Sequence, residues 1–350
     1  MKNKKVLVGL SGGVDSAVAA YLLKQEGYDV TAGFMINYMA PEGEYCPTRE
    51  DIEVAREVAT YLDIPFFTFN YIEEYEKKVL KYMYDGYKSG ITPNPDIMCN
   101  SEIKFRCFLD EAISLGFDMV ATGHYAKIEE ENGIYHLLKG IDNNKDQSYF
   151  LAGLDQSQLE KTLFPIGNLE KPKVREIARD AGLPNAERKD SQGICFVGKV
   201  DLHKFLEKEI EKKVGNIVNT DGKILGKHDG VVFYTIGQRK GIQIGGGPAL
   251  YVVKKDIEKN ELIVGTEDDL ALFSRELTAS NFRFLAGNFD FSLKAKSKIR
   301  YRQEDQKVLL EDLGNNRIKA SFENAQRGIA SGQIIAIYIG DELIGSGIIE

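Results

Sequence analysis

The sequence predicts an α/β domain built on a doubly wound parallel sheet, followed by a small β-rich domain and a C-terminal β-barrel or sandwich. Strand-like and helix-like segments alternate through the first half of the chain, which is typical of a parallel sheet covered on both faces. A glycine-rich turn joins the first strand to the first helix. After about residue 201, short alternating runs and turn residues replace the helices.

Each element of the first domain is indicated by its own pattern. Short apolar runs bounded by turn residues indicate strands over residues 6–10, 29–36, 65–70 and 118–123. Apolar side chains at helical spacing indicate helices over 17–27, 50–64 and 103–117, the first of them closed by Gly27. In such sheets, ligands bind at the carboxyl ends of the strands.

After about residue 200, the sequence pattern changes from helices and strands to mostly strands. A last helix is expected over residues 201–210, and β-like runs such as KHDGVVFYTIG and NELIVG follow it. We therefore place the domains at 1–203, 204–274 and 275–350, the last two being β-rich.

Composition indicates a cytoplasmic protein without a membrane partner. The chain has 350 residues, 43% hydrophobic and 28% charged. Its longest apolar runs, such as 334–339, are too short to span a bilayer, and the N-terminal run before the glycines is a first strand rather than a signal peptide. The net charge of −8 argues against a nucleic-acid partner, unless positive charge is gathered locally.

Four cysteines in a chain of this length do not form a disulfide scaffold, and without a CxxC pair a zinc site is not expected. Cys107 lies among apolar residues of a helix and is expected to pack, whereas Cys46 is expected to be an incidental exposed thiol on a loop. Cys99, in ITPNPDIMCN, and Cys195, in KDSQGICFVG, lie on turn-rich stretches. A helix starting at Asn100 or Ser101 would lower the pKa of the Cys99 thiol.

The segment LSGGVDSAVA follows the first strand and opens the first helix. Backbone N–H groups of Gly12, Gly13 and Val14 would cradle an anion there, and Ser11 and Ser16 would add hydroxyl donors. Asp15 would repel a bare phosphate, so we expect it to hold Mg²⁺ beside one. The pattern is neither a Walker loop nor GxGxxG. The alternative is a glycine-rich turn that only starts a helix.

A basic run, FSLKAKSKIRYR (291–302), answers the objection from net charge. In a strand its lysines and arginines would share one face and form a stripe suited to a phosphate backbone. The alternative is an edge strand protected by lysines.

The motif SGGxDS after a first strand resembles the PP-loop ATP pyrophosphatases. A closer resemblance covers nearly the whole chain. SGGVDS, TPNPDIMCNSEIKF, ATGHYA, KDQSYFL, FPIGNLEKP, DSQGICFVG, YTIGQRKGI and IRYRQ occur in the same order as in the tRNA-specific 2-thiouridylases, the MnmA family. The resemblance implies a PP-loop domain related to the adenine nucleotide alpha hydrolases, with a C-terminal barrel that binds tRNA.

The resemblance also implies a role for particular residues. ATP would bind at Gly9, Leu10, Ser11, Gly12, Gly13, Val14, Asp15, Ser16, Met35 and Gly123. The target base would meet Asn94, Pro95 and Asp96. The tRNA would contact His124, Lys145, Asp146, Gln147, Arg300, Tyr301 and Gln333. For His124 the alternative is a capping or packing histidine, and Asp96 is either a general acid or base or a turn-forming residue.

The implied reaction is ATP-dependent 2-thiolation of the wobble uridine of tRNA for Lys, Glu and Gln. Cys195 would carry a persulfide supplied by a cysteine desulfurase or a sulfur-relay protein. Cys99 would either attack that persulfide or only close a transient disulfide with Cys195. Two alternatives are a PP-loop ligase or amidotransferase acting on a small metabolite, and an RNA-binding protein that has lost catalysis; SGGVDS and both loop cysteines argue against the second.

Overall fold

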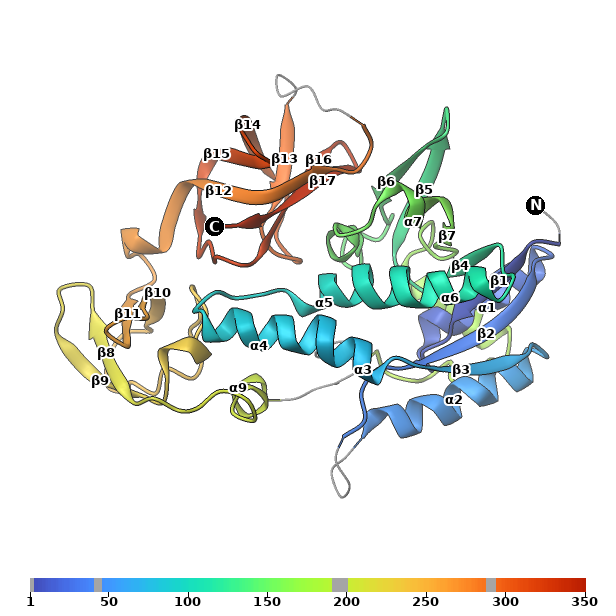
Figure 1. The fold of residues 1–350 in the computed structure, drawn as a ribbon, viewed down its shortest axis with the longest axis horizontal. Coiled ribbons are helices and arrows are strands. Elements are labelled where there is room, and N and C mark those ends of the chain that lie inside the picture. Colours follow the sequence, from blue (N-terminus) through green and yellow to red (C-terminus); the bar gives the residue numbers. More distant parts are fainter. Residues whose placement is uncertain (1–2, 41–45, 191–200, 288–293) are drawn as a thin grey trace.

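The computed structural model describes residues 3–40, 46–190, 201–287 and 294–350 (Figure 1). The elements of the first 190 residues are β1 (Lys5–Gly9), α1 (Val14–Gln25), β2 (Asp29–Ile36), α2 (Pro47–Tyr61), β3 (Phe66–Asn70), α3 (Ile72–Tyr75), η1 (Glu76–Leu80), α4 (Lys81–Lys88), α5 (Pro95–Met98), η2 (Cys99–Cys107), α6 (Phe108–Ser114), β4 (Met119–Ala121), β5 (Ala126–Glu131), β6 (Ile134–Lys139), η3 (Ser148–Leu151), α7 (Gln156–Glu160), β7 (Thr162–Leu163) and α8 (Lys171–Asp180). After residue 200 follow α9 (Leu202–Leu206), β8 (Gly215–Asn219), β9 (Ile224–His228), η4 (Val231–Phe233), β10 (Tyr251–Asp256), β11 (Glu261–Gly265), η5 (Leu270–Leu272), β12 (Phe273–Phe284), β13 (Ala295–Lys298), β14 (Gln306–Gly314), β15 (Arg317–Arg327), β16 (Ile334–Ile339) and β17 (Glu342–Ile349).

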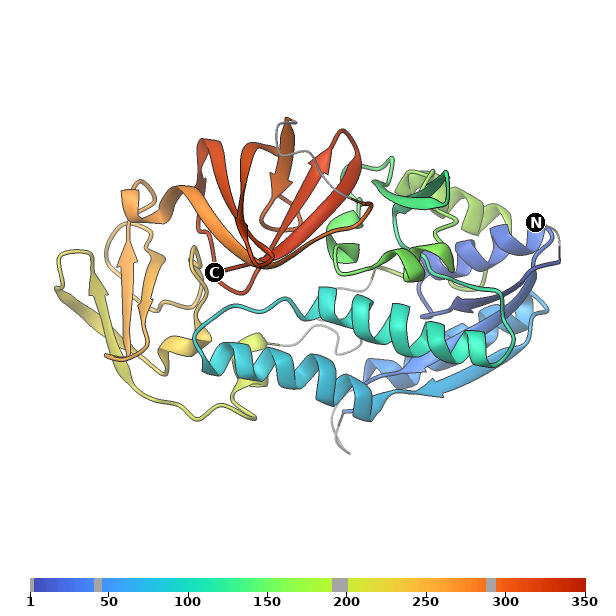
Figure 2. The same ribbon diagram turned by 45° about the horizontal axis from the view of Figure 1, so that its top comes forward.

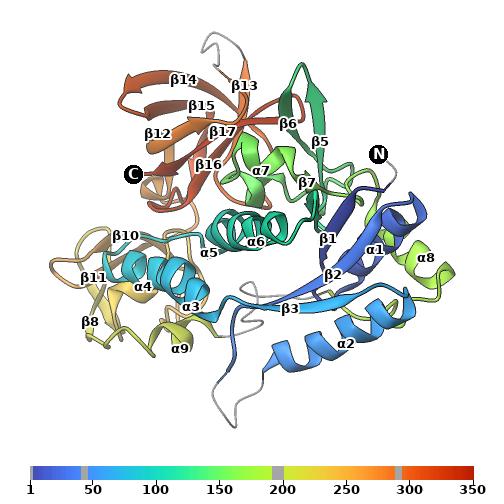
Figure 3. The ribbon, with the colours of Figure 1, turned by 45° about the vertical axis from the view of Figure 1, so that its right-hand side comes forward.

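The first sheet is parallel and has the order β3-β2-β1-β4-β7. Side chains of β1 alternate between its two faces. Val6 and Val8 belong to a core shared with α1, α2 and α8, while Leu7 belongs to a core shared with η1, η2 and α6. Figure 3 shows α1, α2 and α8 on one side of the sheet and α6 on the other. The prediction of a doubly wound parallel sheet is therefore confirmed.

Two long helical segments lie side by side in the centre of the molecule (Figure 2). One runs from α3 through η1 to α4 and was not predicted, and the other runs from α5 through η2 to α6. Both η1 and η2 are π-helical, a wide geometry that occurs mostly in short pieces and often at functional sites. No helix within the described ranges is long and apolar enough to cross a membrane.

The β-rich remainder forms two sheets. The middle sheet has the order β10-β11-β8-β9, with β11 and β8 parallel. The C-terminal strands run in the order β12-β15-β14-β13-β16-β17, and β12 also pairs with β17, which closes a barrel. The predicted barrel is confirmed, and the alternative of a sandwich is excluded.

A hairpin of the first domain extends the C-terminal sheet, which the sequence did not indicate. β5 and β6 form this hairpin, and β6 pairs with β17 through Leu137 and Leu343. Pairing between residues so far apart in the chain leaves no local pattern. It ties the parallel-sheet domain to the barrel.

Several predicted bounds differ from the observed ones. Helix α1 begins at Val14 rather than at residue 17, because Gly13 has an extended backbone and acts as its N-cap. Helix α9 covers only Leu202–Leu206 of the helix expected over 201–210. Of the strand expected over 291–302, residues 295–298 form β13, residues 299–302 form a turn, and residues 291–293 lie outside the described residues.

Candidate active site

The glycine-rich loop joins β1 to α1 at the carboxyl end of the sheet and is held by its own serines. The Ser16 hydroxyl lies 3.1 Å from the Ser11 hydroxyl, accepts from the Ser11 N–H at 3.1 Å and donates to the Gly13 carbonyl at 3.0 Å. Gly12 has a φ of +78°, which favours glycine. These bonds fix the order of strand, loop and helix that an anion site needs.

Met35 and Gly123 lie against this loop, as the predicted nucleotide site requires. A Cβ atom on Gly9 would come within 3.1 Å of Met35 Cε. A Cβ atom on Gly123 would come within 2.6 Å of both the Asp15 carbonyl carbon and the Ser16 nitrogen. Position 123 therefore has room only for glycine beside the start of α1.

The Gly123→Ala variant is expected to lose about 2 kcal/mol of stability and to raise KM for ATP, because backbone atoms of α1 cannot yield as a flexible side chain would. Thermal unfolding and the ATP dependence of pyrophosphate release measure the two effects. Gly247→Ala is the matched control, since an added Cβ there meets nothing within 4 Å. If the two variants have equal melting temperatures and equal KM values for ATP, the close approach of Gly123 to α1 does not matter for stability or for ATP binding.

Asp15, next to the glycine-rich loop, belongs to an ion-pair network. Lys171, at the start of α8, is buried, and its Nζ lies 2.6 Å from Asp15 Oδ1 and 2.8 Å from Asp190 Oδ1. The Tyr125 hydroxyl donates to the same Asp15 oxygen at 2.8 Å. Burial alone would raise the pKa of Asp190, but hydrogen bonds from Lys145 and Lys171 outweigh it and lower this pKa to about 2.

The segment 185–190 also contacts the glycine-rich loop. The Gly12 carbonyl accepts from Asn185 Nδ2 at 2.9 Å and from Arg188 Nη1 at 3.1 Å. Arg188 also pairs with Asp51 at 2.6 Å, and Asp190 also pairs with Arg175 at 2.8 Å. None of these residues was given a role from the sequence. The only sequence signal was that Lys171 lies in FPIGNLEKP and Asp190 lies in DSQGICFVG, two blocks that carry the family resemblance.

The position of Cys99 differs from the prediction. Asn94, not Asn100 or Ser101, caps the helix, since its side chain accepts from the Ile97 N–H at 3.2 Å, and Pro95 is the first helical residue. Proline suits that position because the first N–H of a helix has no partner in any case. Cys99 therefore lies inside a helical segment and not at its N-terminus, so the predicted helix start at Asn100 or Ser101 is wrong.

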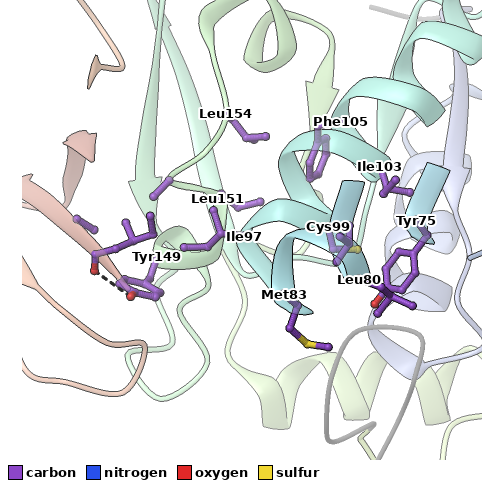
Figure 4. Close-up of a cluster of buried hydrophobic side chains, with 14 of the residues drawn as sticks. Tyr75, Leu80, Met83, Ile97, Cys99, Ile103, Phe105, Tyr149, Leu151 and Leu154 are labelled. Carbon is purple, nitrogen blue, oxygen red and sulfur yellow. Dashed lines mark hydrogen bonds between the residues drawn. The ribbon is translucent and has the colours of Figure 1, made fainter. Parts of the chain in front are cut away.

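Cys99 is fully buried, at 0% exposure, in the apolar cluster between the two central helices. Figure 4 shows its side chain among Tyr75, Leu80, Met83 and Ile103. A sulfur atom delivered from another residue can reach this thiol only after one of these helices moves or the delivered group enters the cluster.

Cys46 and Cys107 differ in their burial and surroundings. Cys46 was expected to be exposed but is 6% exposed, because it caps α2 and accepts a hydrogen bond from the Ala40 N–H at 3.4 Å. Cys107 is half-buried beside Lys78, and burial raises the pKa of its thiol. The predicted persulfide carrier, Cys195, lies outside the described residues.

Asn94 lies at a seam between the first domain and the barrel. Its Nδ2 donates to Gln333 Oε1 at 3.4 Å, and Gln333 Nε2 donates to the Thr92 carbonyl at 2.9 Å. The Tyr149 hydroxyl donates to the Ile334 carbonyl at 3.0 Å. The structure thus joins a residue predicted for the target base to one predicted for the tRNA, although 239 positions separate them. Pro95 and Asp96 follow in the first turn of α5, where the carboxylate of Asp96 suits the helix dipole.

Arg300 and Tyr301 lie in the turn after β13, near the same seam. The Tyr301 ring is 4.3 Å from the ring of Phe150, the neighbour of Tyr149. Arg300 Nη2 donates to the Arg327 carbonyl. Burial and the charge of Arg327 lower the pKa of Arg300.

Other residues predicted to contact tRNA have internal partners. His124 is buried, lies 2.7 Å from the Thr122 hydroxyl and packs on Phe105 and Phe164, and burial holds its pKa well below the usual value. Asp146 is 5% exposed and accepts from two N–H groups and the Ser148 hydroxyl. Gln147 exchanges hydrogen bonds with the Tyr125 backbone. Lys145 pairs with Asp190 at 2.7 Å. The side chains of His124 and Asp146 therefore face the interior.

The basic run keeps its predicted alternation of side chains, but two of its lysines are paired with carboxylates. Ala295 and Ser297 face the barrel core, and Lys296 and Lys298 lie on the other face. Lys298 lies 3.5 Å from Asp146 and 3.9 Å from Asp305, and Lys296 lies 3.7 Å from Asp305. Carboxylates of distant segments thus compensate these lysines, so a continuous basic stripe is not formed here.

Comparison with known proteins places the chain. Residues 4–199 match the family described as the tRNA methyl transferase HUP domain. Residues 203–266 match the tRNA methyl transferase PRC-barrel domain, and residues 274–349 match the Aminomethyltransferase beta-barrel domain. The tRNA-specific 2-thiouridylase MnmA 1 of Geobacillus kaustophilus is 48% identical over 100% of this chain and 96% of its own length. The chain belongs to the MnmA family. The tRNA-specific 2-thiouridylase MnmA of Alkaliphilus oremlandii is 46% identical over 100% of this chain and 98% of its own length.

Two solved structures match at lower similarity. A U34-tRNA thiolase NcsA from Methanococcus maripaludis, with its [4Fe-4S] cluster, matches with a TM-score of 0.36 and 19% identity over 52% of this chain and 58% of that one. A 4-thiouridine synthetase–RNA complex with bound ATP matches with a TM-score of 0.37 and 18% identity over 59% of this chain and 50% of that one. Likeness at this level carries no functional argument.

Proposed function

We propose that this member of the MnmA family is an ATP-dependent tRNA-uridine 2-sulfurtransferase that acts on the wobble uridine. The observation that carries the proposal is identity of 48% to a 2-thiouridylase along the entire chain. The geometry supports it, since Cys99 shares a buried cluster with Met35, which lies against the glycine-rich loop. The same cluster contains Ile97, next to the segment that contacts Gln333 through Asn94.

The proposed reaction has two steps, adenylation of the uracil and transfer of sulfur. The uracil 2-carbonyl oxygen attacks the α-phosphate of ATP, pyrophosphate leaves, and C2 becomes electrophilic because AMP is now its leaving group. In the direct route, the outer sulfur of the Cys195 persulfide attacks C2 and AMP departs. Cys99 then attacks the Cys195 sulfur, which breaks the S–S bond, leaves the sulfur on C2 and forms a Cys99–Cys195 disulfide. If Cys99 attacks the persulfide, hydrosulfide is released as the nucleophile and a Cys99–Cys195 disulfide remains, which a reductant must reopen. Asn94, Pro95 and Asp96 would hold the base, with Asp96 near its edge.

ATP would bind on the loop from Gly9 to Ser16, beside Met35 and Gly123. Mg²⁺ typically binds through one or two carboxylates together with substrate phosphates, and Asp15 offers one carboxylate at the loop. Among the described residues, no group of three or more acidic, histidine or cysteine side chains could hold a metal ion.

The partners follow from the reaction. The substrate would be tRNA for Lys, Glu or Gln, contacted by Arg300, Tyr301, Gln333 and the segment around Lys145. A cysteine desulfurase or a sulfur-relay protein would supply sulfur. A reducing compartment such as the cytoplasm keeps the thiols available.

One experiment tests the proposal against its competitors. Purified protein is incubated with ATP, unmodified tRNA, a sulfide source and a reductant, and both pyrophosphate and modified nucleosides are measured. We expect pyrophosphate release that depends on tRNA and a thiolated, not methylated, uridine. Pyrophosphate release without tRNA would favour a small-metabolite ligase. A methylated nucleoside would favour the activity that the matching family descriptions name. Binding of tRNA without either product would indicate an RNA-binding protein that has lost catalysis.

A further inference from the structure

A cavity of about 280 Å³ opens where three parts of the chain meet. Thr92 comes from the segment that leads into α5, Val253 and Lys255 come from the middle sheet, and Ser274, Ile329 and Ser331 come from the barrel. The lining therefore mixes apolar walls, hydroxyl groups and two lysines, Lys254 and Lys255.

Lys255 is unusual among these residues. Its Nζ is buried and has no hydrogen-bond or ion-pair partner in the part of the chain that the structure describes. Burial lowers the pKa of its ammonium group to about 8, so the group is still mostly charged at neutral pH. A buried charge without a partner is costly, and proteins normally supply a counter-ion. No carboxylate belongs to the described lining of this cavity.

We propose that this cavity binds a phosphate group of the tRNA backbone, with Lys255 as its counter-ion. A phosphodiester carries one negative charge and several acceptor oxygens, which match one ammonium group and the hydroxyl groups of Thr92 and Ser331. The proposal rests on the proposed function, since it assumes that tRNA is the substrate.

The location favours RNA over a free ion. The Thr92 N–H donates to the Ser331 carbonyl at 2.7 Å, so two walls of the cavity are bonded to each other. Each wall leads within two residues to the seam, where Asn94 meets Gln333 at 3.4 Å. Contacts to phosphates fix the register of a nucleic acid without reading its bases. A phosphate held here would therefore position the strand whose base is presented to Asn94.

The first test measures binding of unmodified tRNA to the full-length protein, without ATP or a sulfur donor, at several salt concentrations. We expect Lys255→Gln to weaken binding about tenfold and to lower the slope of log affinity against log salt by about one. Lys255→Arg should retain most of the affinity. Lys223→Gln is the matched control, because Lys223 is exposed at the end of the middle sheet away from the cavity.

The second test needs no enzymatic activity. An amine-reactive reagent at pH 8 should label Lys255 whenever its Nζ turns from the buried position into the cavity, and tRNA should protect it, as measured by mass spectrometry. Equal protection by the same concentration of inorganic phosphate would assign the site to a free anion and overturn the RNA assignment. Unchanged affinity of Lys255→Gln, with no protection by tRNA, would overturn the site itself. Failure of the wild-type protein to bind tRNA would instead overturn the proposed function. Removal of an unpaired buried charge should not lower the melting temperature, so loss of folding does not confuse the result.

Discussion

Replacing Cys99 with alanine is expected to reduce tRNA thiolation at least about a hundredfold, while tRNA-dependent pyrophosphate release continues. The thiol is proposed to work on sulfur carried by Cys195 and not on the adenylation step, so the two products should separate. The measurement is the ratio of thiolated nucleoside to pyrophosphate over many turnovers. Cys195→Ser should show the same separation.

The burial of Cys99 makes a control necessary. Since Cys99 is 0% exposed within an apolar cluster, alanine also removes packing, at a cost of about 1 kcal/mol. Cys107→Ala, eight positions along the same helical segment, removes a half-buried thiol without a proposed role and should thiolate normally. If both variants thiolate like the wild-type protein, Cys99 is only a packing residue.

A single turnover distinguishes the two roles left open for Cys99. With the persulfide already loaded on Cys195, a Cys99→Ala protein that still transfers sulfur to C2, held as a tRNA–Cys195 disulfide adduct that a reductant releases as 2-thiouridine, would show that Cys99 only closes the disulfide. Loss of that first turnover would show that Cys99 attacks the persulfide. Either role requires access to a thiol that the central helices now cover.

The fold class and the nucleotide loop could be predicted because their signals are local. Alternating apolar runs and the segment LSGGVDSAVA specify β1, the turn and α1 within a few residues of one another. The setting of Cys99 was predicted wrongly because proline has two opposite meanings. The stretch ITPNPDIMCN was interpreted as turn-rich, whereas Pro95, after the capping side chain of Asn94, is the first residue of a helix.

Long-range partners explain the remaining differences. Lys296 and Lys298 read as free positive charge in the sequence, but Asp305 and Asp146 come to them only through the fold. The same holds for Lys171 and Asp15, whose paired atoms are 156 positions apart. Charge patterns in a sequence give the sign of a side chain but not its neighbours.

Replacing Lys171 with methionine is expected to cost about 3 kcal/mol of stability and to lower kcat/KM for ATP at least about tenfold. The Lys171 side chain is 10% exposed and bridges two carboxylates that are 31% and 32% exposed, so the expected loss is at the lower end for breaking a buried ion pair. Asp15 would then place an uncompensated charge beside the loop that must hold phosphates. Chemical denaturation and the ATP dependence of pyrophosphate release measure the two effects.

The acid stability of the same variant gives an independent check. The pKa of Asp190 is held at about 2, below its ordinary value, so its contribution to stability is present above about pH 4 and is lost as the pH falls towards 2. Without Lys171 this pKa should rise, because one of its cations is gone, and acid unfolding should begin at higher pH. Lys173→Met is the matched control, since Lys173 lies on the same helix, is exposed and pairs with exposed Glu176 at 2.5 Å. Because exposed pairs contribute little, this control should follow the wild-type protein in both assays, and a Lys171→Met protein that does so too would show that the network is not needed beneath the nucleotide loop.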